Sequence, residues 1–354
     1  MTKKNIKTDS MISRIMKDDS ISIVMQGSVL DPNGGLSTDI VNNIVSVRES
    51  FPSAEFILST WAVDKEIEKK LASLSEKYSI IILYNEDPGA IRSYDGVVSS
   101  NINRMIVSTK NGILASKNNY VIKIRTDSLL YNNSLKSLFF QLIGSKINKK
   151  RNDAYKIFDN YVINCNLFAR DARGYLPYLF HPGDICLAGN RNDLKRLFDI
   201  QLADDSIFTD VSRACFLSFM KYVPEQYIWV RCIENKIGRG IYSGNNDYDR
   251  QVIKLSENYY VNNFIALSPS QIGFSWPKHE SVYRNKGHYS IYSINDWKAL
   301  YNKHNSQYFS INKRKKLIKV LISFCMMIYF FVRTSVLKVP LFRKIAIKLF
   351  RKRG

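Results

Sequence analysis

The sequence lacks the short motifs that mark several common enzyme classes. It has no GxxxxGK[ST] phosphate loop, no GxGxxG after its first apolar segment and no GxSxG turn, which disfavours ATPases, dinucleotide-binding enzymes and α/β-hydrolases. Its five cysteines are widely spaced and form no CxxC pair, so neither a zinc knuckle nor a redox dithiol is expected. The first 20 residues contain no apolar stretch typical of a secretory signal, so we expect an intracellular protein.

Acidic residues are missing from the segment that begins at residue 311. The 354-residue chain has a net charge of +21 at pH 7, and this segment alone holds 13 basic residues. The first 310 residues therefore carry 39 basic against 31 acidic residues and are only mildly basic. Because the basic excess is confined to a tail, the charge does not indicate binding to nucleic acid.

The same tail contains the most apolar run of the chain, residues 317–332. As a helix this run would be roughly 24 Å long, less than the ~30 Å of a bilayer core. Residues 341–354 then place apolar side chains at helical spacing among lysines and arginines, a pattern typical of a basic amphipathic helix on an anionic membrane. The alternative is a buried core helix followed by a solvated charged end. We expect residues 311–354 to be a peripheral or monotopic membrane anchor with both flanks on the cytoplasmic side.

The first third of the chain alternates between strand-like and helix-like segments. Strands are predicted at 20–26, 54–59, 79–84 and 120–124, and helices at 36–50, 64–77 and 101–117. Farther on, we predict strands at 154–164 and 184–187 and helices at 192–200 and from Pro224 to the residue before Gly238. The alternation predicts an α/β fold with a mostly parallel central sheet flanked by helices.

In such sheets, ligands bind outside the carboxyl ends of the strands. The positions to examine are therefore Gln26 and Gly27, the loop 85–92 and the residues after the 120–124 strand. There, Asp127 follows Arg125 and could hold a divalent metal on a diphosphate, or simply cap the next turn.

A polar stripe runs along the helix predicted at 101–117. Asn101, Arg104, Ser108 and Asn111 are spaced to share one face, opposite a row of isoleucine and methionine side chains. Ordinary amphipathicity would explain this pattern. A stripe of Asn, Arg and Ser is better suited to hydrogen bonding with a partner than to a solvated face. Arg104 could hold a phosphate or carboxylate with two hydrogen bonds.

Two carboxylates are candidates for a general base that removes a proton from an acceptor hydroxyl. Asp184 lies in the turn HPGD before an apolar segment, where it could equally be a turn residue. Glu225 follows Pro224 at a predicted helix start, where the helix dipole also favours an acid.

Several segments together resemble the WavE family of lipopolysaccharide-synthesis proteins, which are bacterial glycosyltransferases. In chain order they are ISIVMQGSV, FPSAEFILSTW, NEDPGAIRS, NINRMIVSTKNGILASKNNYVIKIRTD, HPGDICLAG and PEQYIW. They span about residues 20–235, and NxNRxxxST followed by YVxKxRxD is the most distinctive part. The resemblance implies a GT-A-like nucleotide-diphospho-sugar fold and a role in building surface polysaccharide.

By resemblance, Asp127 stands where GT-A enzymes place their DxD metal motif, so it is the expected ligand of Mn²⁺ or Mg²⁺. The sequence here is Arg-Thr-Asp, and Arg125 replaces the first acid, so that the arginine itself could neutralise the diphosphate. The residues expected to bind the donor are Gln26, Gly27, Asp87, Arg92, Asn101, Arg104, Arg125 and Asp127. Asp184 and Glu225 are the expected catalytic residues.

These lines predict a glycosyltransferase of the hexosyltransferase type at the cytoplasmic face of the bacterial inner membrane. It would transfer a sugar from a nucleotide-diphospho-sugar to a lipid-linked glycan of lipopolysaccharide, O-antigen or capsule biosynthesis. A non-catalytic membrane scaffold of polysaccharide assembly and a membrane-associated nucleotidyltransferase are the alternatives. The expected organisation is an extension at 1–19, a transferase domain at 20–310 and the anchor at 311–354. Within the domain, residues 20–130 would form the donor half and 131–310 the acceptor half.

Overall fold

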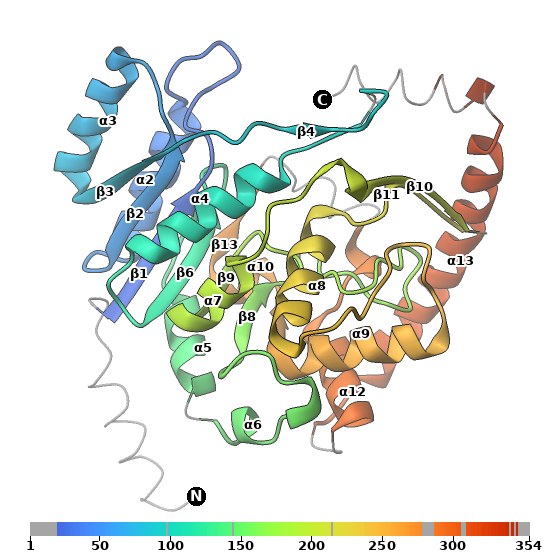
Figure 1. Ribbon diagram of the computed structural model, residues 1–354. Helices are drawn as coiled ribbons and strands as arrows, with labels where there is room; N and C mark the ends of the chain where they lie inside the picture. The colour runs from blue at the N-terminus through green and yellow to red at the C-terminus, as the bar shows by residue number, and fades with distance from the viewer. Residues whose placement is uncertain are drawn as a thin grey trace, which may run out of the picture.

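A seven-stranded sheet forms the centre of the protein (Figure 1). The structure is a computed structural model that describes residues 20–96, 98–143, 145–213, 215–277, 287–305, 309–339, 341, 342 and 345. The predicted extension at 1–19 and most of the predicted amphipathic helix at 341–354 lie outside the described residues. The strands follow the order β12-β8-β9-β6-β1-β2-β3, so one sheet joins the predicted donor and acceptor halves.

The half of the sheet built by the first third of the chain is entirely parallel. Its strands are β1 (Ile21–Gln26), β2 (Glu55–Trp61), β3 (Ile80–Asn85) and β6 (Tyr120–Arg125). Its helices are α2 (Thr38–Ser50), α3 (Lys65–Tyr78) and α4 (Ile102–Ala115). All seven match the sequence prediction to within two residues at each end. Strands β1, β2 and β6 are buried along most of their length, which explains their continuous apolar sequence.

Helix α4 packs across β1, β2 and β3, in front of the sheet in Figure 1, whereas α2 lies behind it. The close approach of α4 depends on Gly112. A Cβ atom at Gly112 would lie 2.4 Å from Val24 Cγ1 and 3.2 Å from Ser59 Cβ, so no larger residue fits without moving the helix. The helix thereby brings its first turn to the carboxyl ends of the strands.

The other half of the sheet contains β8 (Val162–Cys165), β9 (Leu187–Asn190) and β12 (Phe264–Leu267). Strand β9 is antiparallel to both of its neighbours, and every other pair in the sheet is parallel. The two strands predicted here were wrong in extent. Within 154–164 only the last three residues are in a strand, because Asn263 Oδ1 accepts hydrogen bonds from the Ile157 and Phe158 amides and holds that backbone in a loop. Within 184–187 only Leu187 is in a strand, and the backbone carbonyl oxygen of Asp184 accepts a hydrogen bond from the buried Lys123 side chain instead of from a neighbouring strand.

Shorter elements complete the body. The helices are α5 (Ser134–Ile143), α6 (Lys146–Lys149), α7 (Arg191–Phe198), α8 (Pro224–Ile237), α9 (Arg250–Asn263), α10 (Pro269–Ile272) and α12 (Ile294–His304). Two-stranded sheets join β4 (Ile91–Arg92) with β5 (Ser99–Ser100), β7 (Leu129–Leu130) with β13 (Phe274–Ser275) and β10 (Phe208–Arg213) with β11 (Phe216–Met220). The 3-10 turns are η2 (Asp153–Tyr155), η3 (Asp205–Ile207) and η6 (His288–Ser290). Helix α7 agrees with the predicted helix at 192–200, and α8 begins at Pro224 and ends before Gly238, as predicted.

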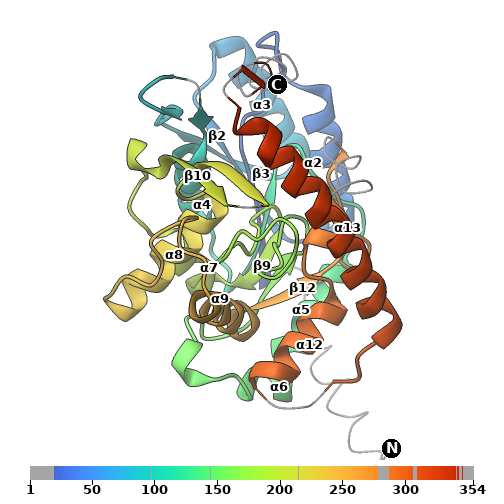
Figure 2. The same cartoon turned by 90° about the vertical axis from the view of Figure 1, so that its right-hand side faces the viewer.

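The predicted apolar tail forms α13 (Lys313–Leu337), a 25-residue helix that runs along one edge of the body beside the β10–β11 hairpin (Figures 1 and 2). Within the described part of the chain it alone is long and apolar enough to cross a membrane, with a mean hydropathy of 2.0. Only 11% of its apolar window is buried against the protein, so it is not the core helix considered as the alternative. The α/β fold and its C-terminal apolar helix are therefore confirmed.

Candidate active site

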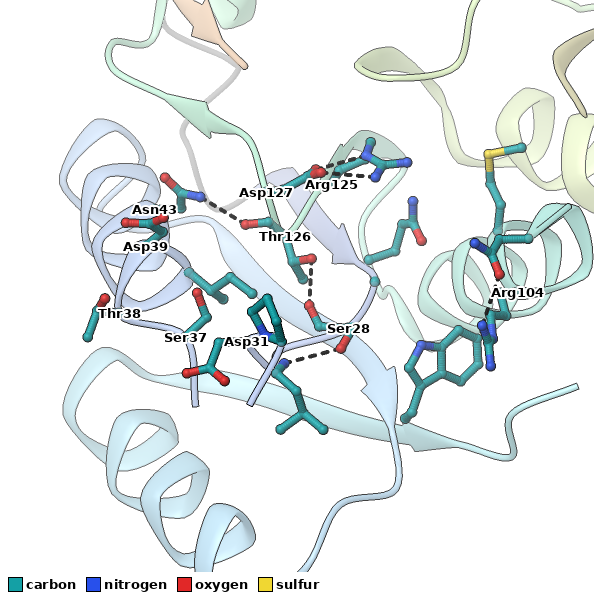
Figure 3. A pocket seen from close by; sticks show the side chains of 18 of the residues that line it. Ser28, Asp31, Ser37, Thr38, Asp39, Asn43, Arg104, Arg125, Thr126 and Asp127 are labelled. Carbon is teal, nitrogen blue, oxygen red and sulfur yellow. Dashed lines mark hydrogen bonds and ion pairs between the residues drawn. The ribbon is translucent and has the colours of Figure 1, made fainter. Parts of the chain in front are cut away.

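A cleft of about 1130 Å³ opens at the carboxyl ends of β1, β2 and β6 (Figure 3). Its walls come from the loop after β1, the first turns of α2 and α4, and the residues that follow β6. Seven of the eight residues predicted to bind a donor line this cleft: Gln26, Gly27, Asp87, Asn101, Arg104, Arg125 and Asp127. The eighth, Arg92, is exposed on β4 and is not among the lining residues.

The ends of β1 and β6 are locked together at the floor of the cleft. Gly27 has φ of 131°, and a Cβ atom there would lie 2.8 Å from Thr126 Oγ1. The Thr126 hydroxyl donates to the Ser28 carbonyl oxygen at 2.8 Å, and the Thr126 amide donates to the Gln26 carbonyl oxygen at 3.0 Å. Only glycine allows this approach without strain, which fixes the height of the Arg-Thr-Asp segment against the first strand.

The loop after β1 forms a wall that the sequence analysis did not identify. Asp31 Oδ1 accepts hydrogen bonds from the Asn33 and Gly35 amides, which holds the loop in a compact turn. Helix α2 begins behind it, and Ser37 and Thr38 line the cleft at its first turn. The turn sequence DPNGG and the serine before an apolar helix were the signals that could have predicted this wall.

The polar stripe of α4 divides between two tasks. Arg104 donates to Asp87 through Nε at 2.7 Å and Nη2 at 2.6 Å, and its Nη1 donates to Asn101 Oδ1 at 2.9 Å. Farther along the helix, the buried Ser108 donates to Gln26 Oε1 at 2.7 Å, and the half-buried Asn111 donates to Asn85 Oδ1 at 2.8 Å. The stripe therefore faces polar partners, and its first turn places a guanidinium in the cleft.

Arg125 and Asp127 form a second bidentate pair at the carboxyl end of β6 (Figure 3). Arg125 Nε lies 2.8 Å from Asp127 Oδ1, and Nη2 lies 3.0 Å from Oδ2. The Arg125 guanidinium also stands 5.3 Å from the centre of the Trp276 ring. Burial lowers the pKa of Arg125, and the carboxylate of Asp127, together with the charges of Asp184 and Glu225, more than offsets this. The guanidinium is thus charged and held in place by an aromatic face and an acid.

The cleft does not fit the divalent metal that the GT-A resemblance implies. Both oxygens of Asp127, the expected ligand, accept hydrogen bonds from Arg125. Asp87 is held by Arg104, and Asp31 by amides of its own loop. Across the described ranges, no three His, Cys, Asp or Glu side chains come together as a metal would require. Guanidinium groups stand beside Asp127 and Asp87, where a cation site would need free oxygens, and Asp39, which also lines the cleft, offers a single carboxylate without such a partner among the described residues.

The two predicted catalytic carboxylates, Asp184 and Glu225, are not among the residues that line the cleft. Both act electrostatically on Arg125 and help to raise its pKa. Asp184 is paired with the fully buried Lys123, whose Nζ lies 2.9 Å from Asp184 Oδ2. Its negative charge is thereby already matched by a lysine inside the protein.

Glu225 has a different environment. It stands at the start of α8, its side chain is 20% exposed, and its Oε2 lies 3.5 Å from His181 Nε2. Burial, together with repulsion from Asp184, raises the pKa of Glu225 to about 7. The pKa of His181 is well below its ordinary value because the imidazole is buried and Arg170 is near, so this histidine is neutral. Glu225 is therefore an acid that changes protonation state near neutral pH.

Comparisons with known proteins agree with the sequence resemblance. The sequence profile described as WavE lipopolysaccharide synthesis matches residues 21–329. No curated protein matches the sequence. Among solved structures, a galactosyltransferase LgtC with donor and acceptor sugar analogs has 15% identity and a TM-score of 0.33, over 49% of this chain and 59% of that chain. This chain thus spans 59% of the length of the LgtC chain.

Two further structures were solved with a nucleotide and Mn²⁺. Glucosyl-3-phosphoglycerate synthase from Mycobacterium tuberculosis has 10% identity and a TM-score of 0.33, over 74% of this chain and 82% of that one. Mannosyltransferase PcManGT from Pyrobaculum calidifontis has 8% identity and a TM-score of 0.35, over 94% and 93%. Likenesses this weak assign no activity, donor or metal to the present chain.

Proposed function

The chain belongs to the WavE lipopolysaccharide synthesis family, and we propose that it is a glycosyltransferase of the hexosyltransferase type. It transfers a sugar from a nucleotide-diphospho-sugar to a lipid-linked glycan during the synthesis of bacterial lipopolysaccharide O-antigen or capsule. The observation that carries this proposal is the cleft at the carboxyl ends of the parallel strands, which gathers seven predicted donor residues from four separate segments. Such a cleft is the usual ligand site of an open α/β sheet.

The donor diphosphate is held by Arg104 and Arg125. Each guanidinium is now paired with a carboxylate in a geometry that a phosphate can share or replace. During transfer, the bond between the sugar carbon and the β-phosphate oxygen breaks, and negative charge accumulates on the departing nucleoside diphosphate. Prearranged positive groups that stabilise such developing charge usually make the largest contribution to catalysis. The arginines supply this charge in a cleft whose carboxylates do not fit a metal.

Glu225 is the general base for the acceptor hydroxyl. As a carboxylate it takes the hydroxyl proton while the acceptor oxygen bonds to the sugar carbon. Its pKa of about 7 suits the task, since a base is most effective when its pKa is near the working pH. Asp184, the other predicted base, is paired with the buried Lys123. Its role is therefore to hold this part of the fold in place, not to accept the proton. Glu225 does not line the donor cleft, but its charge and that of Arg125, which does line it, act on each other.

Helix α13 anchors the enzyme in the plane of the cytoplasmic face of the inner membrane. Most of its apolar side chains are exposed, including Leu317, Val320, Leu321, Phe324, Ile328, Phe331 and Val332. Basic residues 313–316 lie at one end and Arg333 and Lys338 near the other, which suits anionic lipid headgroups. Lys319 ties the helix to the body through Asp171 and Asp296, so crossing the bilayer would require breaking these pairs. A monotopic anchor satisfies both observations.

Calorimetric titration of the full-length protein with nucleoside diphosphates and their sugars tests this function. We expect one donor to bind in the presence of EDTA, and Arg104→Gln and Arg125→Gln each to weaken it at least about tenfold. Arg250→Gln is the matched control, because Arg250 is exposed at the start of α9. Binding that requires Mn²⁺ would refute the role of the arginines. A folded wild type that binds no donor would favour the non-catalytic scaffold.

A further inference from the structure

A second group of arginines surrounds Tyr178, outside the donor cleft. The Arg170 amide donates to the His181 carbonyl oxygen at 2.9 Å, and the His181 ring lies 5.9 Å from that of Tyr178. Arg333 stands beside Phe330, whose ring stacks on Tyr175. Arg170 and Arg333 also lower, through their charge, a Tyr178 pKa that burial raises, and Tyr178 acts on the pKa of Arg213. The rings connect the group: Tyr178 lies 4.8 Å from Phe216, and the Arg213 guanidinium lies 4.3 Å from that same phenyl ring. The loop before β9, the β10–β11 hairpin and α13 thus each contribute one arginine.

None of these three arginines forms an ion pair with an acid in the described part of the chain. Arg213 is sandwiched between the rings of Phe216 and Tyr248, at 4.3 and 4.0 Å, and its buried Nε and Nη1 atoms have no hydrogen-bond partner. Arg170 donates from Nη1 to Ser290, and its buried Nε likewise has no partner. Arg333 lies 5.7 Å from the Phe330 ring. Other arginines of the body, such as Arg104, Arg125 and Arg173, do have carboxylate partners.

An unpaired guanidinium in such surroundings is unfavourable. Burial lowers the pKa of Arg213, which means that the fold destabilises its charged form. Removing donor groups from water without a partner costs free energy that an anion with several acceptor oxygens would recover. Within the described residues, the Nη2 atoms of Arg170 and Arg213 form no hydrogen bond and are absent from the fully buried unpartnered atoms, so each keeps some surface exposed. The stacked, fork-shaped group is arranged for a phosphate.

The position of the group identifies the source of such an anion. The charges of Arg170 and of Arg125, a residue of the donor cleft, both lower the pKa of Glu225. His181 connects the two, since its ring is 5.9 Å from Tyr178 and its Nε2 is 3.5 Å from Glu225 Oε2. Helix α13 supplies Arg333 and exposes its apolar face next to the same group. An anion here is close to the proposed base and to the membrane helix.

We propose that Arg170, Arg213 and Arg333 form an acceptor subsite that binds the phosphate or diphosphate of the acceptor. This rests on the proposed transferase function and deepens it: the subsite selects acceptors whose glycan is carried on a phosphate. The lipid chain then leaves along the apolar face of α13, while the terminal sugar hydroxyl approaches Glu225. A free sugar phosphate offers the same chemistry without the chain.

Calorimetry of the full-length protein in phosphatidylcholine nanodiscs tests the subsite with inorganic pyrophosphate and farnesyl diphosphate as probes. Arg213→Gln and Arg170→Gln should each weaken pyrophosphate binding at least about tenfold, whereas Arg250→Gln should not. Because the donor cleft is itself proposed to hold a diphosphate, the pyrophosphate titrations are repeated in an Arg104→Gln, Arg125→Gln background, where the loss from Arg213→Gln should remain. Farnesyl diphosphate binding more tightly than pyrophosphate indicates a lipid-linked acceptor, and equal affinity indicates a soluble phosphate.

Wild-type affinity for pyrophosphate in both Arg213→Gln and Arg170→Gln overturns the subsite. If Arg213→Gln fails to fold, Arg333→Gln, on the partly exposed α13, replaces it and must weaken binding several-fold; an unchanged affinity overturns the proposal equally. Nucleotide-sugar titrations on the same samples separate the two proposals. Wild type that binds pyrophosphate through Arg213 but binds no nucleotide-sugar retains the anion site and refutes the transferase. Wild type that binds a nucleotide-sugar, with pyrophosphate affinity unchanged by Arg213→Gln, retains the transferase proposal and refutes the anion site.

Discussion

Replacing Lys319 by methionine should detach α13 from the body. Lys319 Nζ lies 2.7 Å from Asp171 Oδ2 and 2.9 Å from Asp296 Oδ2, and it donates to the Ile291 carbonyl oxygen at 2.9 Å. The lysine side chain is 13% exposed and each carboxylate side chain 16% exposed. Lys319→Met leaves these two acids facing each other with little access to water.

Removing one partner of a buried ion pair costs about 3–5 kcal/mol. Water reaches part of this group, so we expect a loss of about 3 kcal/mol in the free energy that holds the helix to the body. At about 1.4 kcal/mol per factor of ten, the population with α13 detached rises more than a hundredfold. Other contacts of α13 with the described body include the stacking of Tyr175 on Phe330 at 5.7 Å, the buried Thr334 and two hydrogen bonds between Asn295 and Asn312 at the start of the helix.

Hydrogen exchange of the protein in nonionic detergent measures this change. The amides of α13 and of the loop around Asp171 should exchange faster in Lys319→Met, while those of β1 and β6 remain unchanged. Lys316→Met is the control, because Lys316 is exposed on the same helix. The triple variant with Asp171→Asn and Asp296→Asn should recover most of the protection, since no buried charge is left unpaired. Wild-type exchange in Lys319→Met, or no recovery in the triple variant, would refute the reasoning.

Three further predictions concern the proposed base Glu225, the contribution of Glu257 to acid stability and the packing of α4 at Gly112. The rate of sugar transfer should fall below an apparent pKa of about 7 as the carboxyl of Glu225 becomes protonated, and Glu225→Gln should abolish activity at every pH; an activity that stays constant from pH 5 to 8 contradicts this assignment. Burial raises the pKa of Glu257, but hydrogen bonds from His304, Arg173 and Lys303 outweigh it and lower the pKa to about 2. The ionised Glu257 therefore adds about 3 kcal/mol to the free energy of unfolding. This contribution is complete above pH 4.5 and is lost as the pH falls toward 2. Acid titration of unfolding should show a shallower fall in stability for Glu257→Gln than for wild type, and parallel curves would count against it. Gly112→Ala should destabilise the fold by about 1–2 kcal/mol, because overpacking against β1 outweighs the better helix propensity of alanine; an unchanged or higher midpoint of thermal unfolding would be inconsistent with the close contact.

Predicted donor residues line the cleft where they end or follow parallel strands. Gln26 and Arg125 are the last residues of β1 and β6, Gly27 and Asp127 come just after them, and the carboxyl ends of parallel strands share one edge of a sheet. Arg104 was found because its helix spacing gives it a defined face. Arg92 was placed outside the cleft, since β4 pairs with β5 and turns that loop away from the main sheet.

Sequence-based prediction failed where side chains from distant segments determine the backbone conformation. The strand expected at 154–164 is mostly a loop, because the side chain of Asn263, about a hundred residues later, accepts hydrogen bonds from two of its amides. Sequence pattern does not contain that partner. The Arg-Thr-Asp segment was recognised as unusual, but its bidentate pairing, which decides the fit of a metal, depends on rotamers and on Trp276.

The sequence by itself determined the α/β alternation, the strand ends that build the cleft and the apolar, acid-free tail, because each depends on local periodicity and composition. Only the tertiary structure decided the rest. It paired Asp184 with Lys123 and left Glu225 as the titratable acid, it set three arginines around Tyr178, and it tied α13 to the body through Lys319. Charge and burial at these positions come from residues that are far apart in the chain, and their effects exist only once folding has brought them together.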